Sequence, residues 1–266
     1  MLKLLNIVAP AYFLCGAAVT FALQLFLFIP AIFGYPSTSI PPFTLFHGVL
    51  FLFLATNTMG NYILTILNPS ECVQDSTFDK KATDQADGVD NQLIKATHFC
   101  KLCSKVIWKR DHHCLFTGNC IGKRNLRYFI MFCLYTSLTC LYSLVLGVAY
   151  LTLEYALSFG SPLTFLTLLP LAVAYFFLGA IPNLEMFLIL MTYVWFGIGL
   201  ACAGFSCQQV LLASQGQTRY LMKKGHPAPY RHWRENLAEV FGTRWILGIF
   251  LPVPTAKLNS HSSKNS

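Results

Sequence analysis

Residues 43–67 of the chain read FTLFHGVLFLFLATNTMGNYILTIL, a run without a single Asp, Glu, Lys or Arg. The charge-free region extends well beyond it, since no charged side chain occurs between Lys3 and Glu71. A bilayer span needs about 20 predominantly apolar residues, so this region is long enough for two spans. The turn-forming residues 34–37, Gly-Tyr-Pro-Ser, divide it. We therefore predict spans at 8–32 and 43–67.

The second half of the chain repeats this pattern. Between Tyr128 and Thr218 the only charged side chains are Glu154 and Glu185. Overall, 55% of the residues are hydrophobic and 11% are charged, whereas about a quarter are charged in typical globular domains. This excludes a soluble enzyme, a secreted disulfide module and a nucleic-acid-binding domain as classes for the whole chain. We predict an all-α polytopic membrane protein.

The basic residues indicate which loops face the cytosol. Of the 19 Lys and Arg, ten fall within 72–127 and eight within 219–264. Cytoplasmic loops of membrane proteins carry such an excess of Lys and Arg near the ends of their spans. The net charge of +8 is therefore interpreted as a topology signal and as attraction to anionic membrane lipid, with no nucleic acid as partner.

Parity sets the number of crossings. Further apolar stretches follow at 128–151, 161–182 and 186–212. Because both basic regions are expected in the cytosol, an even number of spans must separate them. We predict that 128–151 and 186–212 cross the membrane, whereas 161–182 is re-entrant, interfacial or packed within the bundle. The result is four transmembrane helices with both termini in the cytosol, and a five-span chain is the alternative.

The chain thus divides into four parts. Residues 1–67 hold spans 1 and 2, residues 68–127 form a cytosolic loop, and residues 128–212 hold spans 3 and 4. Residues 213–266 form a cytosolic tail. Within the tail, the stretch near 231–251 is expected to lie at the membrane interface, because apolar side chains of its first part share one helical face.

The candidate chemistry lies in the loop, in the stretches HFCKLC (98–103), DHHC (111–114) and NC (119–120). Two cysteines separated by two residues, Cys100 and Cys103, allow both sulfurs to meet one metal ion. A zinc site is expected, with one histidine and one later cysteine completing the set, and the spacing does not say which. Thiols of a cytosolic loop stay reduced, so these cysteines are not expected to form disulfides. The alternative to a zinc site is therefore reduced, unligated cysteines in a flexible loop.

The loop offers more donors than one zinc ion takes. A structural zinc site closes its shell at four ligands, which leaves at least one histidine and one cysteine over. A cysteine beside an imidazole that a carboxylate holds in place is the arrangement that forms a thiolate near neutral pH. Asp111, His112 and Cys114 supply these three groups. The surplus predicts nucleophilic chemistry beside the metal.

The whole chain, with two spans, a cysteine-rich loop, two further spans and a tail, resembles the DHHC family of protein S-acyltransferases (palmitoyltransferases). The resemblance is carried by DHHC at 111–114, by Cys120 six residues after Cys114, by Asn125 before Tyr128, and by NLAEVFG at 236–242. It implies transfer of a palmitoyl-type chain from fatty acyl-CoA, through an acyl-cysteine, to juxtamembrane or cytosolic cysteines of other proteins. It also implies a membrane of the endoplasmic reticulum or Golgi.

The resemblance implies roles for individual residues. Cys114 matches the acylated nucleophile, His112 the general base and Asp111 the carboxylate that orients it. The implied zinc ligands are Cys100, Cys103, His113 and Cys120, within a cysteine-rich domain at about 91–127. The spacing by itself also permits the reverse, with His112 as the ligand and His113 as the base.

One departure from the family pattern and one cluster of basic residues lead to further expectations. The positions of a second zinc site are held by residues that cannot coordinate a metal: Ala86, Val89, Phe99 and Val106. We therefore expect one zinc ion per chain. The basic residues that flank the nucleophile are candidates for the phosphates of acyl-CoA: Lys109, Arg110, Lys123 and Arg124.

Two other functions are weighed against the enzyme. The lost second metal site favours a catalytically weak membrane adaptor of the same fold. A transporter or channel is disfavoured because Glu154 and Glu185 are the only ionisable acids or bases in the apolar second half, and transport pathways usually carry more.

Overall fold

The computed structural model describes residues 2–34, 41–71, 97–225, 231–242 and 245–253. Within them, four helices are long and apolar enough to cross a membrane, as the sequence predicts. The first span is continuous through α1 (Leu2–Ala22), the π-helical segment η1 (Leu23–Phe28) and α2 (Ile29–Phe33). The other three are α3 (Pro42–Leu67), α5 (Leu126–Tyr155) and α7 (Asn183–Ser214). The four-span membrane fold is confirmed.

The helices extend beyond the predicted apolar cores. The first begins at Leu2 and not near residue 8, and α5 continues to Tyr155, four residues past the predicted end. Hydropathy locates the part of a helix that lies in lipid, whereas backbone hydrogen bonding continues into the interface. α5 ends where Ala156 adopts a left-handed conformation, with φ at 53°.

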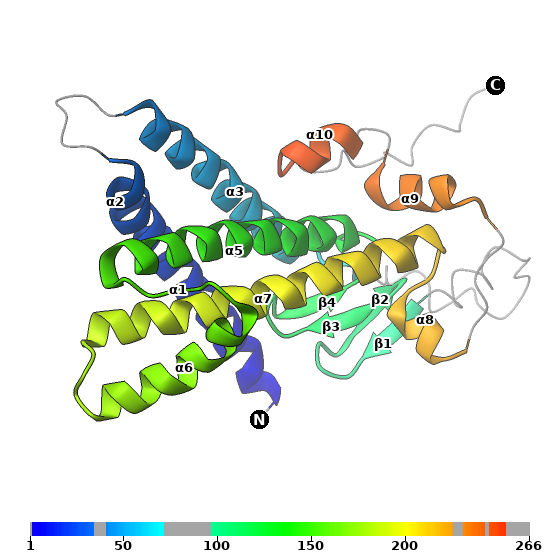
Figure 1. Ribbon diagram of the computed structural model, residues 1–266. Helices are drawn as coiled ribbons and strands as arrows, with labels where there is room; N and C mark the ends of the chain where they lie inside the picture. Colours follow the sequence, from blue (N-terminus) through cyan, green and yellow to red (C-terminus); the bar gives the residue numbers. More distant parts are fainter. Residues whose placement is uncertain (1, 35–40, 72–96, 226–230, 243–244, 254–266) are drawn as a thin grey trace, which may run out of the picture.

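Helix α5 lies at the centre of the bundle, packed against both α3 and α7. Two small residues allow the close approach of α5 and α7: Gly147 lies against Trp195, and Gly199 lies against Cys140. The indole of Trp195 donates a hydrogen bond of 3.0 Å to the hydroxyl of Thr20, which joins α7 to α1. The four spans therefore form one packed unit (Figure 1).

The apolar stretch near 161–182 forms the short helix α6 (Pro162–Phe177). After α5 the chain runs back along the bundle before α6 begins, and α6 then runs towards the end where α7 starts (Figure 1). Sixteen residues extend about 24 Å as an α-helix, less than the roughly 30 Å of a hydrocarbon core. The hydroxyl of Tyr193 on α7 fixes α6, donating to Phe165 O and accepting from Leu169 N.

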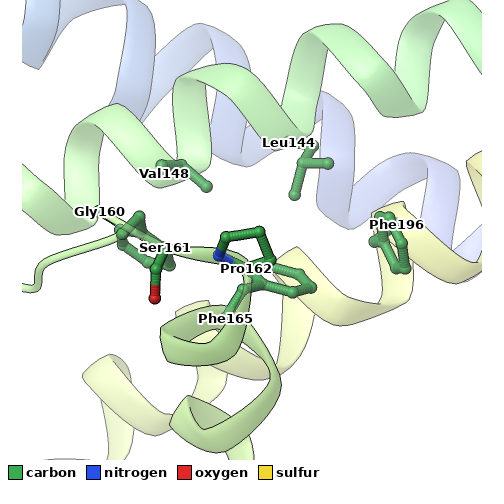
Figure 2. A pocket seen from close by; sticks show the side chains of 8 residues that line it. Leu144, Val148, Gly160, Ser161, Pro162, Phe165 and Phe196 are labelled. Carbon is green, nitrogen blue, oxygen red and sulfur yellow. The ribbon is translucent and has the colours of Figure 1, made fainter.

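An apolar pocket of about 370 Å³ opens where the chain enters α6. Figure 2 shows Leu144 and Val148 of α5, Phe196 of α7 and the Gly160-Ser161-Pro162 turn around it. Leu144 stands 18 residues into α5, about 27 Å along the helix from its first residue. The pocket is therefore remote from the cysteine-rich loop.

The loop adds two β-hairpins to the helical fold. Strand β1 (Thr97–Cys100) pairs with β2 (Lys105–Trp108), and β3 (His112–Cys114) pairs with β4 (Asn119–Ile121). Both lie at the end of the bundle where α5 begins and α7 ends (Figure 1). Strands this short, bounded by glycine and polar turns, show little alternation of apolar and polar residues. The sequence therefore predicted the metal-binding loop but not the strands within it.

The tail folds back onto the bundle through three short helices, α8 (Arg219–Lys223), α9 (Trp233–Phe241) and α10 (Trp245–Phe250). Asn236 of α9 donates to Ser214 O at the end of α7, at 2.9 Å. The hydroxyl of Tyr135 in α5 donates to Ile249 O in α10, at 2.6 Å. The tail thereby packs beside the loop that carries the cysteines.

Candidate active site and metal centre

The cysteine-rich loop is held on the membrane helices by the buried amide of Asn125. Its side-chain oxygen accepts hydrogen bonds from Ser70 Oγ at 3.0 Å and Gly122 N at 2.9 Å. Its nitrogen donates to Thr65 O at 3.1 Å and Cys120 O at 3.0 Å. Four satisfied bonds fix the loop to the end of α3 and place α5 directly after it.

Four side chains of the two hairpins converge within 4.8 Å of one another: Cys100, Cys103, His113 and Cys120. The Nδ1 atom of His113 lies 3.2 Å from Cys103 Sγ, 3.6 Å from Cys120 Sγ and 3.9 Å from Cys100 Sγ. Cys103 and Cys120 are 3.6 Å apart. We call these four residues the metal quartet.

The metal quartet fits zinc. A tetrahedron built on Zn–S bonds of about 2.3 Å and Zn–N bonds of about 2.0 Å has edges of roughly 3.5–3.8 Å, close to the distances observed. Burial and the neighbouring Cys100 and Cys103 raise the pKa of the Cys120 thiol, since three thiolates repel one another without a cation. A metal ion removes that penalty by binding the deprotonated sulfurs.

The other histidine of the motif faces away from the metal quartet. His112 Nδ1 lies 2.7 Å from Asp111 Oδ2, and the Asp111 carboxylate is buried. Burial alone would lower the pKa of His112, but its hydrogen bonds to Asp111 and Cys114 outweigh burial and raise it to about 9. Because Nδ1 is engaged by Asp111, Nε2 is the nitrogen left for Cys114.

Cys114 has the environment of a reactive thiol. It is 8% exposed and packs with Tyr62 of α3 and with Phe129 and Cys133 of α5. Burial alone would raise the pKa of its thiol, but hydrogen bonds from His112 and Thr117 lower it below the usual value. The lowered pKa of Cys114 and the raised pKa of His112 favour a thiolate beside an imidazolium, and the thiolate is the nucleophilic form of cysteine.

Two further groups hold Asp111, and sequence reasoning missed both. Gln209, a buried residue of α7, donates from Nε2 to Asp111 Oδ2 at 2.8 Å. The backbone N–H of Arg219 donates to Asp111 Oδ1 at 2.6 Å. The available signal was a glutamine within an apolar span, where an amide needs a partner. The carboxylate is thereby fixed from three directions.

The four basic residues expected near phosphate do not form one group. Lys109 and Lys123 approach Glu239 Oε1 of α9, at 2.6 and 3.0 Å. Arg110 donates to Phe99 O at 3.4 Å and lies over the ring of Tyr220, whereas Arg124 is exposed. Two of the four are therefore already paired with a carboxylate.

The positions that correspond to the family's second zinc site lie partly outside the described residues, since Ala86 and Val89 are among those not described. The other two, Phe99 and Val106, face each other across the β1–β2 ladder. Across the parts of the chain that the structure describes, the metal quartet is the one Cys/His group with ligand geometry.

These features define a class of protein: a multi-pass membrane protein with a Cys/His cluster that could hold a metal ion, beside a buried cysteine that a histidine contacts. A family model described as DHHC palmitoyltransferase matches residues 90–225. The chain is 56% identical to Palmitoyltransferase ZDHHC22 of Danio rerio over 258 residues, which covers 96% of this chain and 94% of that protein. It is 53% identical to Palmitoyltransferase ZDHHC22 of Homo sapiens over 266 residues, covering 99% and 97%.

A more distant palmitoyltransferase matches over a shorter stretch of the chain. Palmitoyltransferase ZDHHC7 of Rattus norvegicus is 27% identical over 115 residues, which is 39% of this chain and 37% of that protein. The chain belongs to the DHHC palmitoyltransferase family, and the resemblance inferred from the motif is confirmed. It is an enzyme, a protein S-palmitoyltransferase.

Proposed function

We propose that the enzyme moves a palmitoyl-type chain from acyl-CoA to Cys114, and from Cys114 to cysteine thiols of cytosol-facing or membrane proteins. The observation that carries the proposal is the chain of contacts from Asp111 to His112 to Cys114. It gives a buried nucleophile with a base on one side and an orienting carboxylate behind the base.

The chemistry follows from these contacts. The Cys114 thiolate attacks the thioester carbonyl, a new carbon–sulfur bond forms, and the bond to the sulfur of CoA breaks. The imidazolium of His112 supplies the proton to the departing thiolate. In the second half of the reaction, neutral His112 takes the proton of the substrate thiol. The resulting substrate thiolate attacks the acyl carbonyl, the acyl chain moves to it, and Cys114 leaves as a thiolate. Because one thioester is exchanged for another, the reaction needs no nucleotide energy.

The position of Cys114 suits a substrate with a long apolar tail. Burying about 14 methylene groups contributes roughly 11 kcal/mol, so the tail stays in an apolar environment. Cys114 packs against Tyr62 and Phe129, which belong to membrane helices. A thioester at this depth reaches Cys114 while its chain remains among the spans and CoA stays at the cytosolic face.

Zinc is proposed to be held by the metal quartet, where it cross-links the two hairpins. His113 and Cys114 are adjacent in β3, so a fixed His113 also fixes the backbone of the nucleophile. The CoA phosphates are proposed to bind the basic residues Lys109, Arg110, Lys123 and Arg124. Lys109 and Lys123 would then leave their ion pairs with Glu239 to bind phosphate.

Fatty acylation of the purified enzyme tests the proposal. Incubation with palmitoyl-CoA should label the wild-type chain through a bond that hydroxylamine cleaves, and Cys114→Ser should not be labelled. Cys207→Ser is the matched control, because Cys207 is exposed on α7 and should leave labelling unchanged. Labelling of Cys114→Ser at the wild-type level would refute the assignment of Cys114.

We further propose that the enzyme resides in the endoplasmic reticulum or Golgi with both termini in the cytosol. The family and the clustering of basic residues within 72–127 and 219–264 support this placement. Co-localisation of a tagged chain with organelle markers tests it, and labelling confined to the plasma membrane would contradict it.

A further inference from the structure

The imidazole of His113 has a second contact outside the metal quartet. Its Nε2 atom lies 2.9 Å from Oδ1 of Asn6, which belongs to α1. The opposite ring nitrogen, Nδ1, is the atom that faces the three sulfurs. One ring thus bridges the cysteine-rich loop and the first membrane span, across 107 positions of sequence.

Elementary chemistry fixes the direction of this hydrogen bond. A neutral imidazole has one N–H donor and one lone-pair acceptor, and a metal binds the lone pair. The amide oxygen of Asn6 only accepts, so Nε2 carries the proton and the lone pair of Nδ1 points at the sulfurs. The reversed amide would donate to Nε2 and leave an N–H group at Nδ1, where it would block coordination.

The same part of α1 also lies close to the turn of the second hairpin. Gly118, in the turn between β3 and β4, has a φ of +64°, and a Cβ atom there would lie 3.3 Å from the backbone oxygen of Asn6. A side chain at this position would be strained and tight, whereas glycine leaves room. The backbone of Asn6 therefore lies close enough to the turn that a side chain at position 118 would meet it.

We propose that Asn6 is a positioning residue for the metal centre. Its side-chain oxygen accepts a hydrogen bond from the Nε2–H group of His113 and thereby selects the tautomer that binds metal. It also holds the imidazole ring in the orientation in which Nδ1 faces the three sulfurs. Outer partners of ligating histidines typically change metal affinity about 10- to 100-fold. This proposal rests on the proposed binding of zinc by the metal quartet. In it, the Asn6 contact links α1 to the metal centre.

Zinc retention in the purified full-length enzyme tests the proposal. Each protein is loaded with zinc, and transfer to a colorimetric chelator is followed over time. Asn6→Leu keeps the size but has no acceptor, and it should lose zinc at least 10-fold more readily than wild type. Asn6→Asp retains an acceptor and should stay within a few-fold of wild type. Ile7→Ala, an exposed neighbour on α1, should match wild type.

A second measurement separates ring orientation from general damage to the fold. Cobalt replaces zinc, and the visible absorption of the bound ion reports the geometry of its ligands. Asn6→Leu should alter this spectrum while Ile7→Ala and Asn6→Asp preserve it. If Asn6→Leu does not fold, Asn6→Ser, which is too short to reach Nε2, takes its place in both measurements.

The outcomes distinguish this proposal from the proposed function. A zinc-loaded wild type with Asn6→Leu unchanged in release and in cobalt spectrum overturns the role of Asn6 alone. A wild type that acylates Cys114 yet binds no zinc overturns the metal centre, and the role of Asn6 with it, while leaving the acyl-transfer chemistry standing.

Discussion

Among single residues, the two adjacent histidines of β3 point in opposite directions because of the geometry of the strand. Successive side chains of a β-strand point to opposite faces, so His112 and His113 of β3 cannot serve the same centre. His113 faces the sulfurs of the metal quartet, and His112 faces Asp111. This geometry supports His113 as the metal ligand and His112 as the base.

This separation predicts opposite results for two single substitutions. His113→Ala should lose the zinc, about one ion per chain in wild type, and destabilise the loop, because structural zinc contributes to folding. His112→Ala should retain zinc but lose acylation of Cys114, because the thiol loses its proton acceptor. Metal analysis and acylation of both variants provide the check. Loss of zinc from His112→Ala, with zinc kept in His113→Ala, would reverse the two roles.

At the scale of elements, helix α9 acts as a clamp on the cysteine-rich loop. Glu239 receives Lys109 and Lys123 on one carboxylate oxygen and Arg231 on the other, at 3.1 Å. Burial alone would raise the pKa of Glu239, but the two lysines outweigh burial and lower it to about 2. The charge of this carboxylate therefore contributes to the docking of the tail.

Replacing the clamp residue should loosen the tail. Glu239→Gln is expected to cost about 1 kcal/mol of unfolding free energy, since the groups are partly exposed and screened. Glu235→Gln is the matched control, because Glu235 lies on the same helix and, among the described residues, is ion-paired only with Arg231, at 3.5 Å. Thermal unfolding of the purified variants measures both effects. Equal unfolding temperatures for Glu239→Gln and wild type would contradict the clamp.

The sign of the pH dependence follows from the lowered pKa of Glu239. A carboxyl group with a depressed folded-state pKa stabilises the fold above its ordinary value of 4.5 and loses that contribution as the pH falls towards about 2. The difference in stability between wild type and Glu239→Gln should therefore be full at pH 7 and shrink progressively below pH 4.5.

For the whole molecule, the number of membrane crossings depends on whether α6 crosses the bilayer. Its exposed leucines, such as Leu163 and Leu166, suit contact with lipid. The chain returns along the bundle before α6 and continues from it to the start of α7 (Figure 1). This path supports a re-entrant segment, and it leaves α5 and α7 as the two crossings between the basic loop and the tail.

Glycosylation of inserted acceptor sites checks this path. An acceptor carried on a short polar insertion between Leu178 and Pro182 should be glycosylated, because a non-crossing α6 leaves this turn in the lumen. An acceptor placed after residue 255 should not be modified, since the tail is expected in the cytosol. The five-span alternative predicts the reverse at both positions.

The sequence by itself determined the class of the molecule. Each span is a property of about 20 consecutive residues, and the basic clusters mark the loops between them, so the four-span fold follows without tertiary contacts. The motif at 111–114, with Cys120 and Asn125, was local enough to indicate the family. The individual roles of Asp111, His112 and Cys114 remain predictions that activity measurements must check.

The tertiary structure decided what depends on long-range contacts. Sequence spacing left open which histidine meets the sulfurs, because it carries no information about which face of β3 each side chain occupies. Gln209 meets Asp111 across 98 positions, and Asn6 meets His113 across 107. Neither pairing has a local signature, since hydrogen bonds act over about 3 Å in space and are indifferent to separation along the chain. Packing of the spans brings these amides to the loop.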